Sequence, residues 1–83
     1  MDAGVAAGLP RDVSEALTRQ TLLGAATLLA TTGTPPDVLR QNVTSPGGTT
    51  AEGLRVFEEA GFRQLVTDVV LAATRRSREL GQG

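Results

Sequence analysis

The sequence contains no cysteine and no histidine among its 83 residues. Without cysteine the chain cannot form disulfides, iron–sulfur clusters or a thiolate nucleophile, and without histidine it has no imidazole for catalysis. Zinc fingers are excluded too, because their ligands are these two residue types. No other residues stand at metal-ligand spacing, so we predict no metal site.

Aromatic residues are also scarce, since Phe57 and Phe62 are the only two and there is no Trp or Tyr. The apolar residues are mainly Ala, Leu and Val, which bury less area than an aromatic ring. A domain of this size buries only about 60% of the surface of its unfolded chain. Small domains are therefore often stabilised by disulfides, a metal or a partner chain. Here only the partner chain remains, and the composition predicts one.

The chain carries almost no net charge, because its eight basic residues, all arginine, are balanced by nine acidic ones. Nucleic-acid binding normally shows as a basic excess, so we predict no nucleic-acid partner. The most apolar run, residues 21–30, is shorter than the roughly 20 residues that span a bilayer, and no secretory signal is visible. We expect a cytoplasmic protein with no membrane partner.

Glycine and proline divide the chain into helical segments, and no run of β-branched residues alternates with period two. The sequence therefore predicts an all-α fold of one long helix plus three shorter ones. Gly33 and Gly61 are the expected stops. Thr49 is the expected N-cap of the third helix, with Glu52 completing a capping box. The predicted ranges are Pro10 to about Thr32, Pro35 to about Asn42, Thr49 to Ala60, and Phe62 to about Leu80.

Two of these helices carry more apolar surface than one short chain can cover. The long helix is apolar on nearly every side from Leu22 to Ala30, and such a helix must be covered all round. The last helix has an apolar face formed by Phe62, Leu65, Val66, Val69, Val70, Ala73 and Leu80. We therefore predict a homodimer or a higher homo-oligomer.

One loop, residues 44–50, combines Pro46, a glycine pair, four hydroxyls and the start of a helix. Glycines allow backbone N–H groups to form an anion-binding concavity, and a helix N-terminus adds unpaired N–H groups. This pattern suits one small anion such as a carboxylate, although a glycine pair before a helix is also ordinary turn chemistry. Both interpretations stay open on the loop's physics alone. A polyphosphate cradle does not fit, because neither a Walker lysine nor G-x-G-x-x-G is present.

The run from Pro36 to Glu58, centred on V-T-S-P-G-G-T-T, resembles the C-terminal signature of the pyrroline-5-carboxylate reductase family. Four further segments match the family in order: A-G-L-P, R-Q-T-L-L-G-A-A, E-E-A-G-F-R and A-A-T-R-R-S-R-E-L-G. The resemblance covers nearly the whole chain. It implies that residues 1–83 are the family's C-terminal dimerisation domain, an interlocked homodimer of helices, without the N-terminal Rossmann domain.

The family reduces 1-pyrroline-5-carboxylate to L-proline with NADPH or NADH in proline biosynthesis. By this resemblance, the hydroxyl of Ser45 and the backbone of Gly47, Gly48 and Thr49 would bind the substrate carboxylate. The hydroxyl of Thr50 would donate a hydrogen bond to the imine nitrogen and is the expected catalytic group. Asn42 is expected near the nicotinamide end of the cofactor.

The cofactor motif of the family, a glycine-rich turn on a strand, is missing from these 83 residues. We therefore expect the chain alone to be inactive, with the cofactor bound mainly by the missing domain. The alternative is a non-catalytic helical oligomerisation module that keeps the fold without the chemistry. The intact S-P-G-G-T-T loop favours the substrate-binding interpretation.

Overall fold

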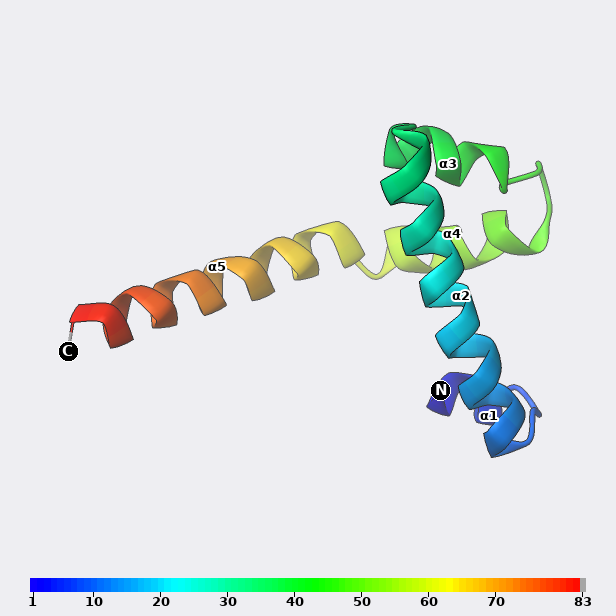
Figure 1. Ribbon diagram of the computed structural model, residues 1–83, viewed down its shortest axis with the longest axis horizontal. Helices are drawn as coiled ribbons and strands as arrows, with labels where there is room; N and C mark the ends of the chain where they lie inside the picture. Colours follow the sequence, from blue (N-terminus) through cyan, green and yellow to red (C-terminus); the bar gives the residue numbers. More distant parts are fainter. Residues whose placement is uncertain (83) are drawn as a thin grey trace. The chain divides into compact units, whose positions relative to one another are not determined.

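The computed structural model describes residues 1–82, and within them the chain is all-α, as predicted, with no strand. Five helices follow one another: α1 (Asp2–Ala6), α2 (Arg11–Thr32), α3 (Pro36–Asn42), α4 (Thr49–Glu59) and α5 (Phe62–Gln82) (Figure 1). They fall into two units, Met1–Asn42 with α1 to α3 and Val43–Gly83 with α4 and α5. The expected pattern of one long and three shorter helices needs correction, because α1 is additional and α5, with 21 residues, nearly equals α2, with 22.

The first unit begins with a small hairpin of α1 against the start of α2, which the sequence pattern did not predict. Ser14 is 1% exposed, and its hydroxyl donates a 2.6 Å hydrogen bond to the Met1 carbonyl. A Cβ on Gly4 would lie against the Ser14 side chain, so only glycine fits where the two helices meet. Arg11 pairs with Asp2 at 2.6 Å. Tertiary contacts of this kind hold a helix that is too short to form alone.

Helix α2 ends where the sequence predicts, at Gly33, which has a left-handed backbone with φ of 66°. Only glycine adopts this conformation without steric cost, which explains the stop. Thr31 and Thr32 precede it, and their hydroxyls donate to the carbonyls of Thr27 and Leu28 at 2.7 Å. These polar side chains are thus satisfied within their own helix and can be covered by apolar groups at low cost.

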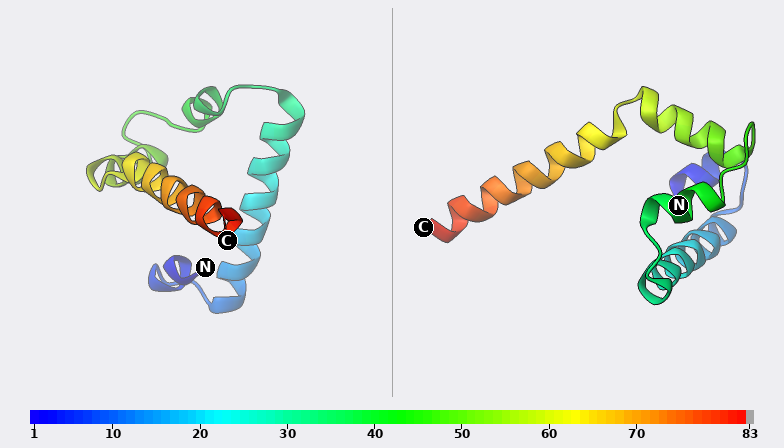
Figure 2. Two further views of the ribbon diagram at one scale, coloured as in Figure 1. Left: turned by 90° about the vertical axis from the view of Figure 1, so that its left-hand side faces the viewer. Right: turned by 90° about the horizontal axis from the view of Figure 1, so that it is seen from above.

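The second unit consists of α4 and α5, joined through Gly61, whose φ is 74°. Phe57 and Phe62 stack across this joint with ring centroids 4.4 Å apart, and Arg63 pairs with Glu58 at 2.8 Å. These contacts lie near the joint. Beyond it, α5 runs on as a single helix with no other element of its unit beside it (Figure 1, Figure 2).

No hydrophobic residue among those described is buried, so neither unit has a core of its own. Leu22 and Leu23 of α2 are 66% and 61% exposed, and Val69 of α5 is 60% exposed. The chain exposes 6789 Å², whereas a compact protein of its mass would expose about 4,700 Å² and two separate compact bodies of half that mass about 5,700 Å². Each of the apolar surfaces predicted from the sequence is therefore uncovered within its own unit.

Across the described helices, none combines the length and the apolar character that a crossing of the bilayer requires.

Candidate functional site

The loop before α4 is organised by a tight turn at residues 45–48. The Gly48 N–H donates to the Ser45 carbonyl at 2.9 Å. Pro46 fills the second position of this turn and Gly47 the third, where its φ of 72° requires glycine; this is the residue pattern of a type II turn. A Cβ on Gly48 would lie 2.7 Å from the Ser45 hydroxyl oxygen, so the Ser45 side chain lies directly against the backbone of Gly48.

Helix α4 begins one residue earlier than the capping-box prediction requires, and that prediction is wrong. Gly48 is the N-cap, Thr49 is the first helical residue, and no side chain caps the helix. The first backbone hydrogen bond of the helix runs from the Glu52 N–H to the Gly48 carbonyl at 3.1 Å. Within residues 1–82 the N–H groups of Thr49, Thr50 and Ala51 therefore have no acceptor, as expected for the first turn of an uncapped helix.

The predicted hydroxyl groups lie in the turn at residues 45–48, at Ser45, and on the first two residues of α4, Thr49 and Thr50. The hydroxyls of Ser45, Thr49 and Thr50 make no hydrogen bond to any described residue, and Thr50 is half-buried. Three free hydroxyls beside three free N–H groups at the positive end of a helix dipole form a donor-rich site for an anion. Of the three backbone groups predicted to bind the carboxylate, those of Gly47 and Thr49 keep a free N–H, whereas the Gly48 N–H is already bonded within the turn.

An ion-pair network on α4 was not predicted, although its spacing could have revealed it. Arg55 donates to Glu52 through Nε at 3.0 Å and Nη2 at 2.5 Å, and to Glu59 through Nη1 at 2.7 Å. Acidic residues three before and four after an arginine lie on the same face of a helix, which is a recognisable pattern. The guanidinium lowers the pKa of the Glu52 carboxyl, and the two carboxylates, Glu52 foremost, raise the pKa of Arg55.

Substitution Arg55→Gln is expected to raise the pKa of Glu52 toward its ordinary value. In the folded chain the ionised pair is present above the ordinary pKa of a glutamate and is lost as the pH falls through the lowered pKa of Glu52. A ¹³C NMR titration of the glutamate carboxyl groups checks this. A midpoint for Glu52 that does not change in the variant would show that Arg55 does not hold its charge.

Asn42, the residue expected near the cofactor, is the last residue of α3 and belongs to the first unit. It is exposed. The described residues contain no strand and no glycine-rich turn on a strand, so they do not supply the phosphate cradle of a dinucleotide site. Nor do three or more carboxylates gather among residues 1–82 as ligands of a metal ion would.

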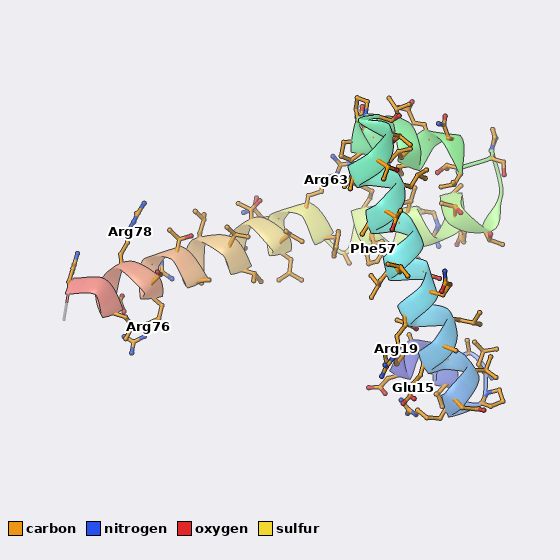
Figure 3. The ribbon with its side chains drawn as sticks, in the orientation of Figure 1. Glu15, Arg19, Phe57, Arg63, Arg76 and Arg78 are labelled. Atoms are coloured by element: carbon orange, nitrogen blue, oxygen red, sulfur yellow. The ribbon has the colours of Figure 1, made fainter. Side chains whose placement is uncertain are left out.

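A hollow of about 490 Å³ lies along the end of α5 and is lined by Leu71, Thr74, Arg75, Arg78, Glu79 and Gln82. All six residues come from one helix, so the hollow is open surface between neighbouring side chains. Arg76, which pairs with Glu79 at 3.1 Å, leaves the helix on the side opposite Arg78 (Figure 3). Arg76 and Arg78 therefore do not converge on one point.

Comparison with known proteins identifies the family of the chain. The family described as "Pyrroline-5-carboxylate reductase dimerisation" matches residues 1–80. Curated relatives named pyrroline-5-carboxylate reductase include one from Arabidopsis thaliana, 53% identical over 98% of this chain, and one from Glycine max, 54% identical over 95% of it. This chain spans only 29% of the length of either.

A solved structure supports the fold. It is the Plasmodium falciparum pyrroline carboxylate reductase with NADP bound, which superposes with a TM-score of 0.87 at 39% sequence identity. The match covers 92% of this chain and 29% of that protein. The helices described above thus correspond to one part of a larger protein.

Proposed function

Since the chain belongs to the pyrroline-5-carboxylate reductase dimerisation family, we propose that it is the dimerising and substrate-binding part of such a reductase. The complete enzyme would reduce 1-pyrroline-5-carboxylate to L-proline with NADPH or NADH. The observation that carries this proposal is the uncapped start of α4, where free N–H groups and hydroxyls directly follow the turn at residues 45–48.

A second copy of the chain is the proposed cover for the apolar surfaces of α2 and α5. Leu28 and Leu29 of α2 and Leu65 of α5 are 47%, 44% and 59% exposed. Because neither unit buries a hydrophobic residue among residues 1–82, each lacks the main favourable term of folding, and a partner copy would supply it. Two copies that exchange these helices would form one shared core, which is an interlocked homodimer.

Each group of the loop has a distinct proposed role. The Ser45 hydroxyl and the N–H groups of Gly47 and Thr49 would bind the substrate carboxylate, with the Gly48 backbone forming the turn beneath it. The Thr50 hydroxyl would donate a hydrogen bond to the imine nitrogen, which makes the adjacent carbon more electrophilic. Such preorganised donors stabilise the charge distribution of a transition state.

The reducing equivalent is a hydride that NAD(P)H supplies when it is bound. The described residues lack a nucleotide cradle, so this cofactor would be held mainly by an N-terminal nucleotide-binding domain, with Asn42 near its nicotinamide end. This division explains how a domain without histidine or cysteine takes part in a reduction: the protein positions and polarises the substrate. We place the enzyme in the cytoplasm.

Two measurements test the proposal. At micromolar concentration the chain is expected to sediment as a dimer or larger, with a melting temperature that rises with concentration. Alone it is expected not to oxidise NADPH in the presence of 1-pyrroline-5-carboxylate, whereas joined to the part of the Arabidopsis thaliana relative that lies outside the matched region it should turn over. A stable monomer would contradict the shared core. A soluble dimeric fusion without activity would favour the non-catalytic oligomerisation module.

A further inference from the structure

We propose that Arg55 is a positioning residue for the substrate carboxylate, because it neutralises Glu52 beside the start of α4. The inference rests on the proposed function of the loop at residues 45–50. It adds a residue that does not touch the substrate in this proposal but sets the charge around it.

Glu52 follows directly after Thr49, Thr50 and Ala51, the three residues whose N–H groups are free. Its own N–H makes the first backbone hydrogen bond of α4, to the Gly48 carbonyl. An acidic residue here normally stabilises a helix by interacting with the positive end of its dipole. If the first turn of α4 also binds an anionic ligand, the negative charge of Glu52 repels that ligand and weakens its binding.

Arg55 is placed to remove this conflict. Its guanidinium binds both oxygens of Glu52, with Nε at 3.1 Å from Oε1 and 3.0 Å from Oε2, and a third bond joins Nη2 to Oε1. Its remaining Nη1 donates to Glu59, one turn further from the helix start. The Glu52 carboxylate is thus held on the Arg55 side of the helix instead of reaching back to cap the first-turn N–H groups.

A purely structural role would give a different result. Exposed ion pairs within a helix contribute little to stability, and both Arg55 and Glu52 are more than half exposed. Loss of Arg55 should therefore hardly change folding. If the pair serves ligand binding, its loss should weaken the binding of a carboxylate in a salt-dependent way.

The test uses the 83-residue chain with L-proline as the probe, monitored by ¹⁵N NMR at low salt, and pyrrolidine as the control ligand without a carboxylate. The Arg55→Gln variant is expected to raise the Kd for L-proline about two- to five-fold, an effect that shrinks at high salt. Adding Glu52→Gln to this variant should restore the Kd. Far-UV circular dichroism and sedimentation verify that each variant keeps the fold and assembly of the original chain.

The matched control is Arg63→Gln, which breaks the comparable exposed pair of Arg63 with Glu58, at the joint between α4 and α5 and away from the start of α4. It should leave the Kd unchanged. Equal L-proline affinity in the original chain and the Arg55→Gln variant would overturn the inference, as would failure of Glu52→Gln to restore binding. Absence of L-proline binding to the original chain would instead overturn the proposed carboxylate site, and this inference with it.

Discussion

Replacement of Leu23 by glutamate is expected to prevent the chain from forming a stable folded dimer. Leu23 lies in the stretch of α2 that is apolar on all sides, and it is 61% exposed in the single chain. Covering this surface with a second copy would bury an unpaired carboxylate, which costs about 3–5 kcal/mol at each site. Every dimer carries the change twice. Far-UV circular dichroism and sedimentation at micromolar concentration measure the loss.

Leu23→Met is the control at the same position, because methionine keeps an apolar side chain of similar volume. This variant should remain folded and dimeric, with a melting temperature within a few degrees of the original. A folded dimer of the Leu23→Glu variant with unchanged stability would show that this part of α2 faces water in the assembly.

Thr50→Val should lower turnover far more than it lowers stability when the chain is part of a complete reductase. Valine nearly matches threonine in shape but removes the hydroxyl that would donate to the imine nitrogen. The loss of one such donor corresponds to about 1–3 kcal/mol, or roughly a 5- to 150-fold fall in kcat. Steady-state kinetics with 1-pyrroline-5-carboxylate, together with a thermal melt, separate the two effects.

Thr50→Ser is the matched control for the role of the hydroxyl, since serine keeps the hydroxyl of threonine and loses only its methyl group. It should retain most of the turnover that Thr50→Val loses. If both variants unfold without a specific kinetic defect, Thr50 serves the folding of the first turn of α4 rather than the reaction.

Local chemistry made much of the fold predictable. The stops at Gly33 and Gly61 were correct because a left-handed residue at a helix end favours glycine strongly. The apolar faces of α2 and α5 followed from periodicity alone. The start of α4 was misplaced by one residue, since Thr49 and Gly48 are both acceptable N-caps and the choice depends on the turn that precedes them.

Other features depend on contacts that a sequence does not display. Helix α1 exists because Ser14 binds the Met1 carbonyl and Gly4 leaves space for it, which is a tertiary arrangement. The loop could be identified as donor-rich, but whether the Gly48 N–H was available depended on the geometry of the turn at residues 45–48. The Arg55 network had a readable spacing, yet spacing does not tell which carboxylate an arginine binds most closely.

The absence of a core within either unit, among the residues described, also has a genetic consequence. If only a second copy covers the apolar surfaces of α2 and α5, the chain folds and associates in a single event. A defective chain then also affects the normal chain with which it pairs. In a cell that makes both normal and altered chains, the altered chain can pair with a normal one and disable it. Substitutions such as Thr50→Val, which leave the apolar surfaces of α2 and α5 unchanged, should therefore be carried into mixed dimers with the normal chain.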